Sequence, residues 1–219
     1  MTTLARLRSD PRITRLEAAL ASRQTGVVDD PVARRAAVAI LIRLGENDEP
    51  EIFFIKRALY EGDPWSGHIA FPGGREEPGD ESLFGTACRE AMEEVEFDLR
   101  REATLIGALD DLRPRAVRLP DIVVRPYVCL MPAPPEPVLS LEVADSFWVP
   151  LSVLLDRSVW RDTTVTAGGM EMSRFAFHHQ GYVVWGMTER ILSGLIELLG
   201  GGETLRDDLG MPKIKTRNA

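Results

Sequence analysis

Apolar and polar positions along the chain predict strands and helices that interleave. A nearly unbroken apolar run over 36–44 indicates a strand that is buried on both faces. The turn-rich segment 45–50 separates it from a second strand at 51–57, so the two predict a hairpin. Further strands are expected at 104–109 and 122–130, and 147–151 leads into a short helix. A second hairpin is expected where the runs 174–179 and 182–185 flank Gln180-Gly181.

Three segments show the periodicity of amphipathic helices. The segment 4–23 is broken at Pro11 and predicts a short turn followed by a helix laid over the main body. The clearest helix is 82–95, with Asp80 as the expected N-cap, and another is expected at 186–200. Because strands and helices interleave without a regular strand–helix–strand rhythm, we expect an α/β fold (α+β) with a mixed sheet between helices.

Length and cysteine content predict one reduced domain. The 219 residues suit a single domain with a core at about 34–199, an N-terminal helical extension at 1–30 and a C-terminal tail at 201–219. The two cysteines, Cys88 and Cys129, lie inside apolar runs. They therefore indicate core thiols rather than a disulfide framework.

Charge and hydropathy exclude several classes of partner. The net charge is −8, which disfavours nucleic acid because that binding depends on neutralising phosphates. There is no signal-like start and no apolar run long enough to span a bilayer, so we expect a cytoplasmic protein without a membrane partner. An anionic substrate would need a local source of positive charge, which a carboxylate-held divalent cation supplies.

The segment 60–80 is rich in residues that favour turns. It holds five of the 18 glycines and three of the 15 prolines. A loop of this length in a compact domain is usually functional or disordered, and Trp65, Ile69 and Phe71 argue for order. Near its end, the turn at 71–74 lets backbone groups approach a ligand closely.

Candidate chemistry lies on the helix that follows this loop. Glu90, Glu93 and Glu94 share one face, because residues three and four apart are neighbours on a helix. Mg²⁺ prefers carboxylate and water oxygens, so the cluster suits a metal. From the helix alone, a solvated acidic face explains the pattern equally well.

Loop and helix together resemble the Nudix hydrolase family. Its signature is Gly, five residues, Glu, seven residues, then Arg-Glu-apolar-X-Glu-Glu-X-Gly-apolar. Glu81, seven residues and the run Arg89–Phe97 match the second half, except that Glu96 stands where the family has Gly. Because that Gly commonly ends the helix in a left-handed turn, we expect Glu96 to change how the helix terminates.

The loop spacing departs from the signature in a second way. Six residues, not five, separate Gly74 from Glu81, and Asp80 occupies the usual position of the Glu. The segment 73–80, GGREEPGD, resembles the loop of the coenzyme A pyrophosphatase branch, which often reads Gly-Gly-Lys/Arg-X-Asp-Pro-X-Asp. The branch's second upstream arginine is absent here.

The resemblance implies a Nudix-type α/β/α sandwich and a Mg²⁺-dependent hydrolase, with Mn²⁺ as a second candidate cofactor. It implies that Glu90, Glu94 and the Gly74 carbonyl bind the metal. Glu93 shares the ligation or acts as the base, and Arg89 orients the glutamates. Glu142 is a second candidate base, with an exposed loop acid as the alternative interpretation.

The substrate implied is a small nucleotide-derived molecule. Coenzyme A or acyl-coenzyme A is the first candidate, and ADP-ribose or a nucleoside triphosphate is the alternative. A third hypothesis is an inactive Nudix-fold module that binds a ligand or regulates. Arg57 and Arg75 are the candidate substrate cations. His68 could meet a phosphate and each of the four tryptophans could stack a base, but a surface or packing role is expected for His68 and core packing for the tryptophans. Whether the chain forms a homodimer is left open.

Overall fold

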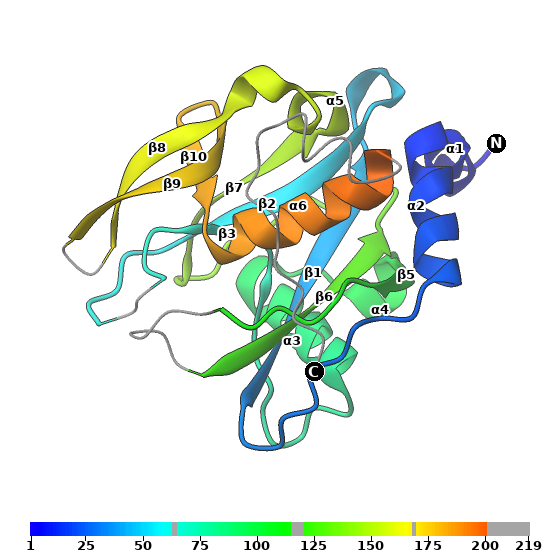
Figure 1. Ribbon diagram of the computed structural model, residues 1–219. Coiled ribbons are helices and arrows are strands. Elements are labelled where there is room, and N and C mark those ends of the chain that lie inside the picture. Colours follow the sequence, from blue (N-terminus) through cyan, green and yellow to red (C-terminus); the bar gives the residue numbers. More distant parts are fainter. Residues whose placement is uncertain (63–64, 115–120, 168–169, 201–219) are drawn as a thin grey trace.

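The computed structural model describes residues 1–62, 65–114, 121–167 and 170–200 (Figure 1). The predicted C-terminal tail at 201–219 lies outside them. The helices are α1 (Thr3–Ser9), α2 (Pro11–Ser22), α3 (Leu83–Val95), α4 (Leu99–Glu102), α5 (Leu151–Leu154) and α6 (Met187–Gly200), with 3-10 turns η1 (Glu46–Asp48) and η2 (Arg157–Val159). The strands are β1 (Arg34–Leu44), β2 (Pro50–Arg57), β3 (Ile69–Ala70), β4 (Gly73–Arg75), β5 (Thr104–Ala108), β6 (Ile122–Leu130), β7 (Val143–Pro150), β8 (Trp160–Ala167), β9 (Met170–His179) and β10 (Tyr182–Trp185).

A mixed sheet lies between helices, which confirms the predicted fold class. The strand order is β3-β2-β1-β6-β5, with β4 also paired to β1 and β7 to β2. β1 and β6 are parallel, and the remaining pairs of this sheet are antiparallel. In Figure 1, α6 crosses one face of this sheet and α3 lies on the other.

The alternation along β1 explains how both faces are buried. Ile40 and Ile42 belong to the apolar cluster that includes the buried side chains of α1, α2 and α6, whereas Ala39 and Leu41 belong to the cluster of α3. Successive side chains of a strand point to opposite faces, so a continuous apolar run suits a strand with helices on both sides.

The sheet opens at the end where the glycine turn lies. β1 pairs with β2 through Ile42–Leu44, but it pairs with β4 through Ala36–Val38. β2 meanwhile continues alongside β3, with Ile55 opposite Ala70. The chain from β3 to β4 therefore crosses from one neighbour strand to the other, and this local splitting leaves room for a pocket.

The N-terminal segment differs from the prediction. Residues 3–9 form a helix rather than a turn, and Asp10 caps α2 by accepting a hydrogen bond from the Arg12 amide at 2.8 Å. Pro11 therefore begins a helix, a position where its missing N–H is not needed. Leu7, Ile13 and Leu16 are fully buried in the core.

The ends of α3 also differ from the prediction. Ser82, not Asp80, is the N-cap and accepts from the Gly85 amide at 3.1 Å. At the other end, Glu96 adopts a left-handed conformation (φ 57°), and its amide donates to the Met92 carbonyl at 3.1 Å. The helix thus ends in the turn expected of Gly, so the expectation that Glu96 changes the ending was wrong.

A second sheet of order β10-β9-β8 packs beside the first. The predicted hairpin at Gln180-Gly181 is present, with both residues at positive φ (46° and 86°). Sequence reasoning missed β8, because its run of threonines and charges shows little apolar alternation. Cys88 and Cys129 are buried and not bonded to each other, as predicted.

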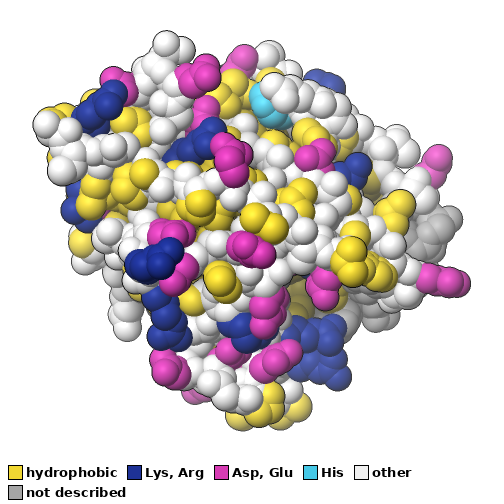
Figure 2. All heavy atoms as spheres, turned by 180° about the vertical axis from the view of Figure 1, so that it is seen from behind, with side chains coloured by type: hydrophobic (Ala, Val, Ile, Leu, Met, Phe, Trp, Pro, Cys, Tyr) yellow, Lys and Arg dark blue, Asp and Glu magenta, His cyan; other side chains and the backbone are white. Residues whose placement is uncertain are grey.

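On the face behind Figure 1, acidic and basic side chains are intermixed (Figure 2). Ion pairs near α3 and α4 fit this pattern, including Arg100–Glu81 and Arg101–Glu102. Among the described helices, none combines the length and the apolar character needed to cross a membrane.

Candidate active site

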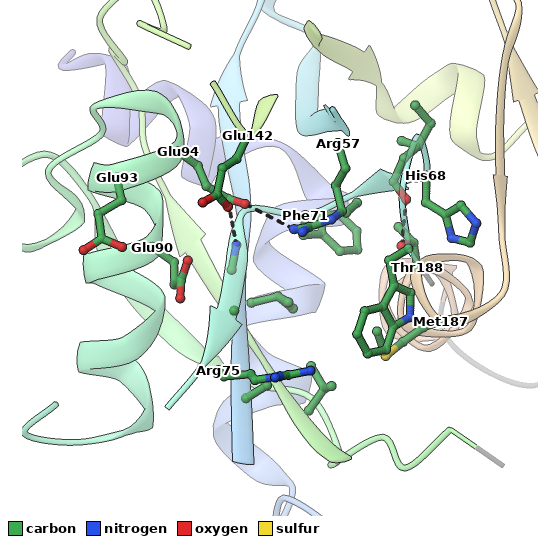
Figure 3. A pocket seen from close by; sticks show the side chains of 18 of the residues that line it. Arg57, His68, Phe71, Arg75, Glu90, Glu93, Glu94, Glu142, Met187 and Thr188 are labelled. Carbon is green, nitrogen blue, oxygen red and sulfur yellow. Dashed lines mark hydrogen bonds and ion pairs between the residues drawn. The ribbon is translucent and has the colours of Figure 1, made fainter. Parts of the chain in front are cut away.

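A pocket of about 720 Å³ lies where the main sheet opens. Its walls come from the loop before β3, the turn into β4, α3, the segment 140–142 and the start of α6. Glutamates stand on one side and aromatic and aliphatic side chains on the other (Figure 3). The pocket thus joins an acidic face to an apolar one.

Glu94 is the most buried acid of the pocket, with 3% of its side chain exposed. Its Oε2 accepts a hydrogen bond from the Gly73 amide at 2.9 Å, and its Oε1 lies 3.6 Å from Nη1 of Arg57. The pKa of Glu94 is raised to about 8, chiefly by burial; the charges of Glu90 and Glu142 add to this rise, while the Gly73 hydrogen bond and Arg57 oppose it. Burial thus favours the protonated form of Glu94, and a bound cation would favour the ionised form.

Glu90 lies directly over the glycine turn. A Cβ added at Gly74 would come within 2.3 Å of Oε1 of Glu90, so only glycine leaves this carboxylate its present place. Burial raises the pKa of Glu90, and Arg89 opposes that rise. Gly73 has a different constraint, because its Cβ would meet the Ala37 carbonyl oxygen at 2.2 Å.

Arg89 links the loop to the acids. Its Nε and Nη2 donate to the two oxygens of Asp80 at 3.1 and 3.2 Å, and its Nη1 donates to Glu90 and Glu93 at 3.0 and 2.9 Å. Nη2 also donates to the carbonyl of Arg75 at 2.9 Å. With this many partners, Arg89 is placed to orient the carboxylates.

Asp80, and not Glu81, is the loop acid that meets Arg89. The hydrogen bonds from Arg89 lower the pKa of Asp80 to about 2, and only 6% of its side chain is exposed. Glu81, which the signature spacing aligned with the family's Glu, is exposed and pairs with Arg100 at 3.0 Å. Of the two loop acids, Asp80 therefore takes the place that faces Arg89.

Glu93 and Glu142 occupy different places. Glu93 is 58% exposed and stands at the rim, held by Arg89. The carboxylate of Glu142 lies beside that of Glu94 (Figure 3) and affects its pKa. Glu142 is exposed, as an acid of a loop would be, yet it lines the pocket.

Comparison with known proteins agrees with this geometry. Residues 33–167 match the model of the NUDIX domain. The chain belongs to the Nudix family. It is 33% identical over 165 residues to a Yersinia pestis protein named NudL, described as an uncharacterised Nudix hydrolase, covering 75% of this chain and 79% of that one. An uncharacterised Schizosaccharomyces pombe protein is 35% identical over 141 residues, but the match spans 56% of this chain and only 43% of its relative.

A solved structure supports the fold. The MutT/nudix family protein from Enterococcus faecalis superposes with a TM-score of 0.51 at 14% identity, over 96% of this chain and 80% of that one. Membership of the Nudix family makes the chain a hydrolase of phosphorus-containing anhydrides, a class that generally uses divalent metals.

The donors of this Nudix site suit a hard divalent cation, although they do not converge around one. Across the described ranges, no three Asp, Glu, His or Cys side chains are grouped closely enough to hold a metal ion. Arg89 draws Glu90 and Glu93 toward itself, while Glu94 faces Gly73 and Arg57. The fit rests on the chemistry of the donors, because carboxylate and carbonyl oxygens are the ligands that Mg²⁺ and Mn²⁺ prefer. In addition, the raised pKa of the buried Glu94 shows that its carboxylate has too little positive charge nearby, which a cation would supply.

The two predicted substrate cations differ in their surroundings. Both Arg57 and Arg75 line the pocket. Arg57 forms an ion pair with Glu94, so its positive charge is partly offset before a substrate binds. Arg75 is exposed, and its backbone carbonyl accepts from Arg89.

Sequence reasoning missed the aromatic wall. Trp65, His68, Trp185 and Met187 all line the pocket, and the rings of His68 and Trp185 lie 4.5 Å apart. Packing was expected for His68 and both tryptophans. Trp148 and Trp160 do pack, against Phe53 and Phe177 respectively.

Proposed function

We propose that the chain is a divalent-metal-dependent pyrophosphohydrolase that cleaves the diphosphate linkage of a nucleoside diphosphate derivative. The proposal rests above all on the buried acid Glu94, which stands with Glu90 against the Gly73-Gly74 turn on one side of a 720 Å³ pocket. Small-molecule sites typically enclose about 300–1,000 Å³, so a nucleotide derivative fits.

Glu90, Glu94 and the Gly74 carbonyl are proposed to hold Mg²⁺, or Mn²⁺ in its place. When bound, the cation would neutralise the diphosphate and lower the pKa of an attacking water. Arg89 keeps Glu90 in position, and Asp80 fixes Arg89. The Gly73 amide holds one oxygen of Glu94 and leaves the other toward Arg57 and the pocket.

The general base is proposed to be Glu93, with Glu142 as the second candidate. Glu93 is tied to Arg89 at the rim, whereas Glu142 lies beside Glu94 inside the pocket. Measuring kcat as a function of pH for Glu93→Gln and Glu142→Gln decides between them. Only the variant that lacks the base should lose the acidic limb of the pH–rate profile.

Coenzyme A or acyl-coenzyme A is the proposed substrate. Asp80 is the loop acid that engages Arg89, and the loop that it ends, GGREEPGD at 73–80, resembles that of the coenzyme A pyrophosphatase branch. A hydrolysis screen with product identification tests this. It should include coenzyme A, acyl-coenzyme A, ADP-ribose, dinucleoside polyphosphates and nucleoside triphosphates, with Mg²⁺ or Mn²⁺.

The screen separates the proposed activities by their products. Release of phosphopantetheine and adenosine 3′,5′-bisphosphate supports coenzyme A, whereas faster turnover of ADP-ribose or a triphosphate supports the alternative. Ligand binding without turnover of any compound would support an inactive Nudix-fold module.

A further inference from the structure

Part of the far wall of the pocket is built by residues that lie beyond the matched NUDIX segment. The match ends at residue 167, but Trp185 and Met187 also line the pocket. Met187 lies across the pocket from the glutamates (Figure 3). Trp185 ends β10, and Met187 begins α6. The matched segment thus carries the acids, while a segment outside it closes the pocket.

Several contacts fix this wall. Gly186 turns the chain between β10 and α6 with φ 73°. Thr188 Oγ1 is buried and donates to the Ile69 carbonyl of β3 at 2.9 Å. These contacts bring His68, one residue before β3, against Trp185, with ring centroids 4.5 Å apart and planes at 56°.

This wall has the composition of a surface that binds an aromatic ring. His68, Trp185 and Met187 are only half-buried, so part of each side chain faces the pocket. Indole and imidazole faces stack on planar rings, and the Met thioether contacts ring edges favourably. A nucleobase offers such a ring, and stacking does not require that its hydrogen-bonding edge be read.

We propose that His68 and Trp185, with Met187 beside them, form the subsite that binds the nucleobase of the substrate. This proposal rests on the proposed function. The glutamates then face the diphosphate across the pocket. The segment from β10 to α6, together with His68 of the matched NUDIX segment, then determines the preference for a nucleoside-containing substrate.

The test compares two ligands that share a phosphate and a ribose but differ in the base. AMP and ribose 5-phosphate are titrated by calorimetry, with and without Mg²⁺, into the full chain, Trp185→Leu and Trp185→Phe. Trp148→Leu is the matched control, because Trp148 packs on Phe53 with centroids 4.8 Å apart and does not line the pocket.

Loss of the stacking contact between the base and the protein should weaken AMP binding about tenfold or more. We expect the full chain and Trp148→Leu to bind AMP at least about tenfold more tightly than ribose 5-phosphate. Trp185→Leu should lose that preference, and Trp185→Phe should keep most of it. If Trp185→Leu does not fold, His68→Leu provides the same comparison.

Two results would overturn the subsite: equal affinity of the full chain for both ligands, or an AMP preference that survives the loss of the Trp185 ring. Because binding is measured without turnover, the proposed function fails separately. If no compound of the hydrolysis screen is turned over but AMP is still preferred in a way that depends on Trp185, the proposed activity is rejected and the subsite is supported. Where turnover is found, Trp185→Leu should raise KM and leave kcat nearly unchanged.

Discussion

Arg89 of α3 donates two hydrogen bonds to Asp80, nine positions earlier in the loop, at 3.1 and 3.2 Å. The same guanidinium reaches Glu90 and Glu93. A carboxylate outside the helix thereby sets the orientation of the arginine that holds two acids of the helix. Thr86 supports it by donating to Oδ2 of Asp80 at 2.9 Å.

Removing the carboxylate of Asp80 should lower activity more than removing that of the neighbouring Glu81. We expect Asp80→Ala to lower kcat about 10- to 100-fold, the usual range for a partner that orients metal ligands. Glu81→Ala should leave kcat unchanged, because Glu81 only pairs with Arg100 at the surface. Steady-state kinetics on both variants, with melting curves to confirm folding, make the comparison. A larger loss for Glu81→Ala would show that Glu81, and not Asp80, supports the site.

The choice between Asp80 and Glu81 shows what the sequence does not determine. Helical periodicity grouped Glu90, Glu93 and Glu94, and all three line the pocket, because the spacing of a helix is fixed. The loop has no such period. A turn in which the Glu77 amide donates to Asp80 and the Asp80 amide donates to the Glu77 carbonyl decides which acid faces Arg89.

The aromatic wall was unpredictable for a related reason. Long apolar runs were enough to identify β1, β2 and β6 and the mixed sheet between helices. The meeting of His68 with Trp185 depends on how β10 and α6 return to β3, which is a tertiary contact without a local pattern. Trp185 alone has the sequence context of a core residue.

Gly74→Ala should separate activity from stability. The added methyl group would collide with Oε1 of Glu90 at 2.3 Å, the mobile end of a side chain. We therefore expect the carboxylate to shift, with a fall in kcat of about 10-fold or more and a nearly unchanged melting temperature. Gly194→Ala is the control, since nothing lies within 4 Å of a Cβ there. A fully active Gly74→Ala variant would contradict the placement of Glu90 in the site.

Glu94→Gln should abolish most of the turnover while the chain stays folded. Glutamine keeps the shape and can still accept from the Gly73 amide, but it cannot offer a charged oxygen to a cation. Because partners of metal ligands are worth about 10–100-fold, loss of a ligand should cost about 100-fold or more in kcat. Activity is measured with saturating Mg²⁺ alongside a melting curve. Near-normal turnover by a folded variant would remove Glu94 from the proposed metal site.

The raised pKa of Glu94 predicts how pH and metal act on stability. Its folded-state pKa is about 8, above the ordinary 4.5, so between these values the unfolded chain has lost a proton that the folded chain keeps. This group therefore makes the metal-free protein less stable as pH rises from 4.5 to 8. A bound cation needs the ionised form, so the stabilisation by Mg²⁺ should grow over the same interval.

Melting temperatures with EDTA or Mg²⁺ at pH 5.5, 7 and 8 measure this linkage. The increase on adding Mg²⁺ should be smallest at pH 5.5 and largest at pH 8. Glu94→Gln has no such proton to lose, so its response to Mg²⁺ should be small and should vary little with pH. An equal Mg²⁺ response at all three pH values in the unsubstituted chain would contradict the assignment.

Glu96→Gly should stabilise the fold without changing the chemistry. Glu96 holds φ 57° at the end of α3, a conformation that costs a residue with a Cβ roughly 1–2 kcal/mol and costs glycine little. Its side chain is exposed and lies beyond the acids that line the pocket. We expect urea unfolding to show that Glu96→Gly raises the free energy of unfolding by about 1 kcal/mol, with kcat unchanged.

Glu96→Ala separates the backbone effect from the loss of a negative charge at the helix C-terminus, because alanine removes the charge and keeps the Cβ. Equal gains for the two variants would mean that the charge, and not the left-handed turn, sets the cost of this departure from the family signature.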